Sequence, residues 1–151
     1  MAAQHFVGLA DATLDGKNRV TLPSKFRLDG LGETLYLTAL DSGVLYLYSE
    51  QEFNALRERV VRMLDGDGTD LAKAQQFLER LSGATERVTV DDNGRILIPT
   101  RHVEHAHLAK VVRMRGAFHR LELWEPTLLD ARTAEATMPL DALATSIGVR
   151  L

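Results

Sequence analysis

The sequence predicts an α+β fold that is mainly β, built from two copies of one small unit. The stretch LDGKNRVTLPSKFR (14–27) and the stretch VDDNGRILIPTRHV (90–103) share an Asp, then an Arg four residues on, then a Pro four further. The copies are 76 residues apart, and the offset still holds where VLYLY (44–48) falls on RLELW (120–124). A chance match of one short motif would not keep register over that distance, so an internal repeat organises the chain.

Each copy is expected to hold four short strands and one short helix. A strand leads into the Asp-x-x-x-Arg turn, and apolar residues alternate after it in RVTLP and RILIP, as in a half-buried strand. The proline ends that strand and can open a short helix. Two strands follow in each copy, TLYLTA (34–39) with VLYLY, and KVVRMR (110–115) with HRLELW (119–124). Two interlocked copies can close a small pseudo-twofold barrel that leaves few free edges.

Amphipathic helices are expected after each copy. Ser49 with Glu52 forms a capping box, and helical spacing then places four apolar residues on one face, Phe53, Leu56, Val60 and Met63. DGDGTD (65–70) breaks this helix, and a second one carries Leu71, Ala74, Leu78 and Leu81. Pro126 stands where the helix after the second copy would begin.

The predicted division of the chain follows from these elements. The first repeat with its trailing helix occupies 5–64, a linking loop and helix 65–81, and the second repeat with its helix 82–137. The tail 138–151 has weak periodicity and is expected to be partly ordered at best.

Composition excludes several classes of protein. The chain has 151 residues, no cysteine and no apolar run near the ~20 residues that span a bilayer, so disulfide frameworks, thiolate sites and a membrane protein are excluded. The net charge of −3 argues mildly against nucleic acid. However, residues 15–27 carry four cations and one acid, and residues 95–120 carry six Lys or Arg and one acid. Because an approaching polyanion responds to local charge, a basic face is compatible with the negative total.

The repeated turn has two interpretations. In the first, Asp15 and Arg19 form only a turn-closing ion pair, and such an exposed pair contributes about 0–1 kcal/mol. In the second, the aspartate holds the loop while the arginine reaches a phosphate or a guanine edge as a planar fork, and Lys17 contacts phosphate. A structural pair needs no extra cations beside it, which favours the second. Position 93 is Asn where the first copy has Lys17, so the first turn is expected to contact DNA more strongly.

The candidate site residues fall into two sets. The expected DNA-binding residues are Lys17, Arg19, Lys25, Arg27, Arg95 and Arg101. The expected loop-structuring residues are Asp15, Asn18, Asp91 and Gly94.

These motifs resemble the MraZ family of transcriptional regulators. LDGKNRVTLPSKFR is similar to the family's Asp-x-Lys-Gly-Arg signature, and DDNGRILIP with GAFHRLELWEP is similar to its second copy, over roughly residues 5–137. One departure is Asn18, where the family has Gly. The family is similar to AbrB-type swapped-hairpin DNA binders, so the resemblance implies two tandem AbrB-like units in one chain.

The resemblance also implies a function. It implies a cytoplasmic, nucleoid-associated bacterial regulator of the division and cell-wall gene cluster that represses its own promoter through tandem short G-rich boxes. The implied partners are double-stranded DNA and further copies of the chain in a ring-shaped homo-oligomer, with no membrane, cofactor or small-molecule substrate. The alternative is an oligomeric scaffold or antitoxin-like protein–protein module that does not bind DNA.

Other patterns carry less. HVEHAH (102–107) could suggest a metal, but a solvated or phosphate-facing histidine cluster is the better interpretation. No catalytic motif is present, so the chain is not expected to be an enzyme. Tyr46, Tyr48 and Trp124 are expected to pack in the core or at a subunit interface rather than to stack on bases.

Overall fold

The computed structural model describes residues 5–28, 30–66 and 70–151, which form eight strands and six helices. The elements of the first copy are β1 (Leu9–Thr13), β2 (Arg19–Thr21), α1 (Ser24–Leu28), β3 (Thr34–Ala39), β4 (Leu45–Ser49) and α2 (Glu50–Leu64). α3 (Leu71–Ala84) links the copies. The second copy follows as β5 (Thr85–Thr89), β6 (Arg95–Leu97), α4 (Thr100–His105), β7 (Val111–Gly116), β8 (Leu121–Trp124) and α5 (Pro126–Ala134), and α6 (Leu140–Ser146) lies in the tail. The α+β class is confirmed.

The two copies are interlocked. Six strands form one antiparallel sheet in the order β1-β7-β8-β4-β3-β5, and β2 pairs with β6 as a separate two-stranded ribbon. The six-strand order reads the same when each strand is exchanged for its repeat counterpart, so the sheet has pseudo-twofold symmetry. Each copy lends its first strand to the other, because β1 pairs with β7 and β5 pairs with β3.

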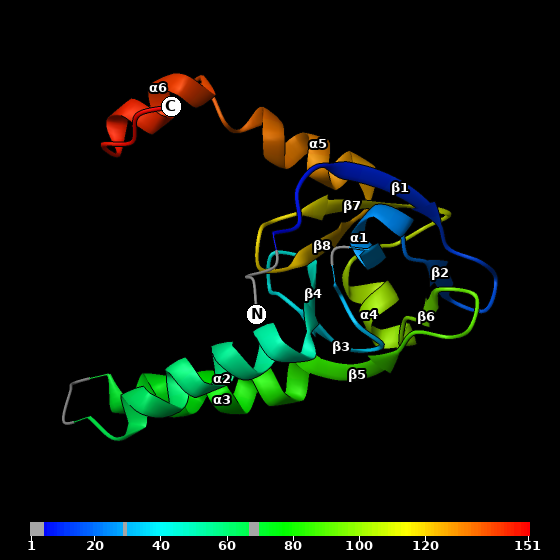
Figure 1. The fold of residues 1–151 in the computed structure, drawn as a ribbon, viewed down its shortest axis with the longest axis horizontal. Coiled ribbons are helices and arrows are strands. Elements are labelled where there is room, and N and C mark those ends of the chain that lie inside the picture. The colour runs from blue at the N-terminus through cyan, green and yellow to red at the C-terminus, as the bar shows by residue number, and fades with distance from the viewer. Residues whose placement is uncertain (1–4, 29, 67–69) are drawn as a thin grey trace.

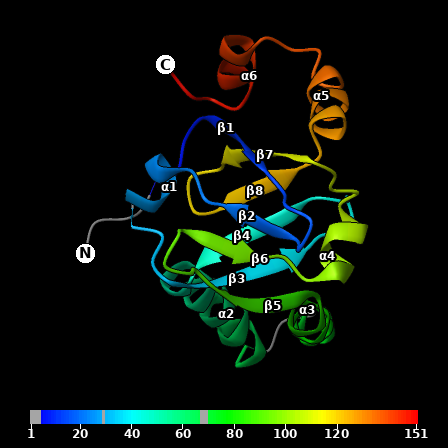
Figure 2. The same ribbon diagram turned by 90° about the vertical axis from the view of Figure 1, so that its right-hand side faces the viewer.

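The ribbon bridges the two edge strands of this sheet, β1 and β5. β2 lies beside β1 and β6 beside β5, and a single bridge joins Leu14 to Val20. Among the described residues the ladders stay an open six-stranded sheet plus a ribbon, rather than the closed barrel suggested by the sequence. Figure 2 shows β2 and β6 side by side in front of the larger sheet.

Both copies supply the core, and they do so with equivalent residues. Val20 and Ile96, on the inner face of the ribbon, are fully buried. The repeat-equivalent pairs Leu45/Leu121 and Leu47/Leu123 are fully buried in the main sheet. Burying each such side chain contributes roughly 1.5–3 kcal/mol. Neither copy holds this core alone, which is the structural reason for the duplication.

The helices lie outside this core. Ser49 caps α2 by accepting a hydrogen bond from the amide of Glu52 at 3.2 Å, as the capping box predicts. α2 and α3 form an antiparallel hairpin that projects from the sheet, and α5 and α6 project from another part of the body toward the same side of the view (Figure 1). Part of the predicted 65–70 break lies outside the described residues. No helix in the described ranges is long and apolar enough to cross a bilayer.

None of the six described helices lies over the outer side of the ribbon (Figure 2). In Figure 1 β2 and β6 lie at the right-hand end, whereas the α2–α3 hairpin and α6 extend to the left.

Candidate nucleic-acid interface

The two Asp-x-x-x-Arg turns have the same geometry. Asp15 Oδ1 accepts hydrogen bonds from the amides of Lys17 at 2.8 Å and Arg19 at 2.9 Å. In the second copy Asp91 Oδ1 accepts from the amides of Asn93 and Arg95, both at 2.9 Å. Each aspartate thus satisfies two backbone donors and fixes the turn in which its arginine begins a strand.

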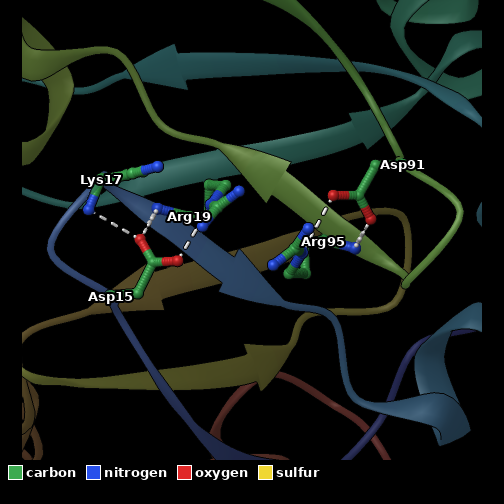
Figure 3. A network of polar contacts seen from close by, with 5 residues as sticks. All are labelled: Asp15, Lys17, Arg19, Asp91 and Arg95. Carbon is green, nitrogen blue, oxygen red and sulfur yellow. Dashed lines mark hydrogen bonds and ion pairs between the residues drawn. The ribbon is translucent and has the colours of Figure 1, made fainter.

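The same aspartates orient the arginine side chains. Asp15 Oδ2 accepts from Arg19 Nε at 2.9 Å, and Asp91 Oδ2 accepts from Arg95 Nε at 2.9 Å (Figure 3). Within the described part of the chain, the terminal nitrogens of both guanidinium groups have no hydrogen-bond acceptor. The arginine side chains are 33% and 29% exposed. The ion pair with the aspartate and a role in binding are therefore compatible. Nε of each arginine is held by the aspartate, and the two terminal nitrogens of the guanidinium group remain available to a ligand.

The ribbon register places both arginines on one face. Arg19 pairs with Leu97 across the ladder, and Arg95 pairs with Thr21. Because side chains alternate along a strand, buried Val20 and Ile96 leave these four residues on the opposite, outer face. The face carries two positive forks on a diagonal, with an exposed threonine and an exposed leucine between them.

The turns hold their carboxylates ionised. The hydrogen bond from the Arg19 amide, followed by those from the Lys17 amide and the Arg19 guanidinium, keeps the pKa of Asp15 below its usual value. The Arg95 amide, then its side chain and the Asn93 amide, lower the pKa of Asp91 in the same way. Both carboxylates are charged at neutral pH and so remain hydrogen-bond acceptors.

Asn18 and Gly94 occupy equivalent left-handed positions. Their φ angles are 62° and 76°, and Asn tolerates this region better than most residues. The carbonyl of Asn18 accepts from the Ile98 amide at 2.8 Å, and that of Gly94 accepts from the Leu22 amide at 2.9 Å. Each turn is thereby joined to the other copy.

The side chains of Lys25 and Arg101 make intramolecular contacts at the surface of the protein. Lys25 Nζ donates to the Leu9 carbonyl at 3.1 Å. Arg101 donates to the Gly83 carbonyl at 2.8 Å and to Glu86 at 2.9 Å. Both cations therefore tie elements together, in addition to any role toward a ligand.

Arg27 belongs spatially to the second turn. A Cβ added to Gly94 would lie 1.6 Å from Arg27 Nη1, so the guanidinium group covers the glycine. The cluster at the second turn consequently draws a cation from the first copy, which the order of residues along the chain did not indicate.

Much of the second basic stretch is neutralised. Arg113 pairs with Asp11 at 2.9 Å and contacts Asp130 at 3.5 Å. Arg115 and Arg120 both donate to Glu122, at 2.6 and 3.1 Å, and Trp124 Nε1 adds a bond of 3.0 Å. Burial alone would raise the pKa of Glu122, but the bonds from Trp124 and Arg115 outweigh it and lower the pKa. The charge count over 95–120 therefore overstates the field that a polyanion meets.

Sequence reasoning missed Thr21, Leu97 and Glu122. Thr21 and Leu97 could have been found from strand alternation, since each follows a buried residue on a strand that begins with the arginine. Glu122 alternates with Leu121 and Leu123 in LELW, a pattern that predicts an exposed glutamate. The structure instead buries both faces of β8, and Glu122 is 4% exposed.

The histidine and aromatic predictions have mixed outcomes. His102 is 1% exposed and interacts with the Ala84 carbonyl, so it is not part of a solvated cluster. Within the described ranges no three His, Cys, Asp or Glu side chains gather as metal ligands. Trp124 packs with Val44 and Leu129 in a small second core, with Tyr46 against it, as expected.

Two interleaved repeats that present an aspartate-oriented arginine pair define a single-chain swapped-hairpin protein with one basic ribbon. Comparison with known proteins gives the family. A family model described as "MraZ protein, putative antitoxin-like" matches residues 81–148, which contain the whole second copy. The chain is similar to the curated transcriptional regulator MraZ of Acetivibrio thermocellus, at 36% identity over 92% of this chain and 94% of the relative.

Further relatives carry the same name. The transcriptional regulator MraZ of Clostridium acetobutylicum is 35% identical over 79% of this chain and 80% of its own, and that of Shewanella oneidensis is 30% identical over 80% and 79%. The chain belongs to the MraZ family. Since these relatives are named as transcriptional regulators, the family is non-enzymatic, as expected from the sequence.

Proposed function

We propose that this protein is a sequence-specific DNA-binding transcriptional regulator that reads the major groove with the β2–β6 ribbon. The single observation that carries this proposal is the outer face of the ribbon, where Asp15 and Asp91 hold Arg19 and Arg95 by Nε and leave both forks free. A two-stranded ribbon fits the major groove, and an arginine fork pairs with O6 and N7 of guanine.

The remaining residues of the face have complementary roles. Lys17 stands in the first turn and contacts phosphate as a point charge, and Arg27 does so beside the second turn. Lys25 and Arg101 support the interface mainly through the backbone contacts described above, while their charge adds to the local field. Asp15, Asn18, Asp91 and Gly94 keep the two turns rigid.

The resemblance to MraZ regulators supports a proposal for the physiological role. We infer a cytoplasmic, nucleoid-associated protein that represses its own promoter and the division and cell-wall gene cluster through tandem short G-rich boxes. The free arginine forks support guanine readout, and the relatives' name supports regulation of transcription.

We also infer that several copies assemble as a ring-shaped homo-oligomer. Leu140 and Leu143 of α6 and Ile147, which caps its C-terminus, are 77%, 46% and 71% exposed and follow one another at helical spacing. An uncovered apolar face of this kind is typical of a protein–protein contact. Several ribbons on one ring then bind successive DNA boxes. Because the ribbons are linked, each bound box raises the effective concentration of the next ribbon, and the overall affinity exceeds that of a single ribbon.

The test is fluorescence anisotropy on a duplex from the gene's own upstream region and on a scrambled duplex, at two salt concentrations. Replacing Arg19 or Arg95 by Ala is expected to cost roughly 1–3 kcal/mol of specific binding. Arg19→Lys keeps the charge and loses the fork, so it should lose discrimination between the duplexes more than it loses non-specific affinity. Arg62→Ala, at an exposed arginine of α2, is the control and should bind as the wild type does.

A reciprocal exchange tests which turn dominates. The two turns differ at Gly16/Asp92, Lys17/Asn93 and Asn18/Gly94, and Lys17 is the one cation among these six residues. Lys17→Asn should therefore weaken binding to all duplexes and lower the salt slope by about 1. Asn93→Lys should do the reverse. Folded wild-type protein that ignores both duplexes would instead establish the scaffold or antitoxin-like alternative.

A further inference from the structure

A cavity of about 320 Å³ lies at the base of the α2–α3 hairpin, where the two helices meet β3 and β5. Tyr36 from β3 stacks on Phe53 from α2, with ring centroids 4.5 Å apart and planes 7° from parallel. Leu78 and Leu81 from α3 complete an apolar wall. The volume falls at the lower end of the ~300–1,000 Å³ that small-molecule sites occupy.

Two cations line this otherwise apolar cavity. Arg57 comes from α2 and Arg87 from β5, and none of the described lining residues is acidic. Over the part of the chain that the structure describes, neither guanidinium group has a hydrogen bond or an ion pair. Arg87 only approaches the Tyr36 ring, at 5.7 Å from its centroid. This contrasts with Arg113, Arg115 and Arg120, each of which has a carboxylate partner.

The hydroxyl groups of the cavity differ in availability. Thr85 Oγ1 donates to the Leu81 carbonyl at 2.6 Å and contacts Thr38 Oγ1 at 2.8 Å, so its hydrogen-bonding capacity is used in the protein. Ser82 lines the cavity, is exposed, and has no hydrogen bond from its hydroxyl among the described residues. Among the described lining residues, the polar side-chain groups without a hydrogen bond are thus the guanidinium groups of Arg57 and Arg87 and the hydroxyls of Ser82 and Tyr36.

We propose that this cavity binds a small amphipathic organic anion, with an aromatic or branched apolar body and a carboxylate or phosphate group. The stacked rings and leucines match the body, and the two forks with Ser82 match the anionic group, because guanidinium pairs bidentately with carboxylate and phosphate. Anion binding also offsets the repulsion between the two like charges that line the cavity. This site is separate from the DNA-binding ribbon and does not depend on the function proposed above.

The experiment uses the full chain and the anionic dye 1-anilinonaphthalene-8-sulfonate, whose fluorescence rises in apolar sites. Arg57→Gln and Arg87→Gln should each weaken binding about ten- to hundredfold, the range expected for a lost charge-assisted hydrogen bond. Ser82→Trp, a change at an exposed position, should fill the cavity and abolish that binding phase. Arg62→Gln, on the same helix but outside the cavity, is the matched control and should leave it unchanged.

Displacement of the dye identifies the chemistry of the ligand. Phenyl phosphate and phenylacetate should displace it, whereas neutral 2-phenylethanol should not, and the better competitor distinguishes phosphate from carboxylate. Equal displacement by the neutral compound, or unchanged dye binding by Ser82→Trp and both arginine variants, would overturn the proposal. Dye binding that appears only when dilution dissociates an oligomer would also overturn the proposal. In that case the cavity would be occupied by a second copy of the chain.

Discussion

The carboxylates of Asp15 and Asp91 couple the stability of the turns to pH. Both have a pKa below the usual value of 3.8, through the hydrogen bonds from the Arg19 and Arg95 amides first. Their stabilising contribution is therefore fully present above pH 3.8 and is lost as the pH falls through the lower folded-state pKa values.

We expect the Asp15→Asn/Asp91→Asn protein to unfold at a lower temperature than the wild type at pH 7. The difference should shrink as the pH falls below 3.8, because the wild-type carboxylates then become protonated too. Thermal unfolding followed by circular dichroism across this range measures it. Asp92→Asn, in the same turn but outside these hydrogen bonds, should match the wild type. A difference that is equally large at pH 7 and pH 3 would contradict the coupling.

At the residue scale, the sequence predicted the turn but not the partners of the cations around it. Asp15 and Arg19 are four residues apart, so their pairing is visible in the sequence. Lys25 instead reaches a backbone carbonyl of β1, and Arg101 reaches the end of α3. Carbonyl groups are the same at every position and leave no trace in residue identity, so a count of clustered charges could not separate free cations from used ones.

At the element scale, the ribbon is symmetric in its backbone and asymmetric in its side chains. Thr21 and Leu97 occupy equivalent positions, but only Leu97, which is 59% exposed, offers a large apolar group. In the major groove, apolar side chains recognise the methyl group of thymine. For the DNA-binding function proposed above, we therefore expect the two halves of the ribbon to differ in base preference and the preferred DNA element not to be a palindrome.

We expect replacement of one thymine by deoxyuridine in the bound duplex to weaken wild-type binding about fourfold, the value of one buried methyl group. Leu97→Ala should bind the thymine duplex correspondingly less well and show no further loss with deoxyuridine. Anisotropy titrations with each thymine replaced in turn measure both effects. Leu9→Ala, at a leucine of β1 that is 57% exposed, should keep the wild-type sensitivity to deoxyuridine. Sensitivity retained by Leu97→Ala would place the methyl contact elsewhere.

The strands themselves were predictable because the alternation of apolar and polar residues marks their extent and a proline marks where a strand ends. TLYLTA coincides with β3, and the short helices begin directly after Pro23 and Pro99. The open sheet was not predictable in the same way, because which ladders close depends on pairing between residues far apart in the chain. β2 and β6, each three residues long, pair with each other rather than with the edge strands β1 and β5.

At the scale of the whole molecule, the ribbon and α6 lie far apart, so the surface proposed for DNA binding and the surface proposed for self-association are different (Figure 1). We expect Leu140→Asp/Ile147→Asp to reduce the molar mass measured by light scattering after size exclusion, because two charges then oppose burial of that face. The same protein should keep its affinity for a single DNA box and lose the added affinity for tandem boxes, since effective concentration no longer acts. Leu97→Asp places a charge at an exposed leucine of the ribbon and should show the opposite behaviour, with unchanged molar mass and weakened single-box binding. If the α6 variant keeps the wild-type mass, the ring is built on another surface, and the uncovered face of α6 needs a different occupant.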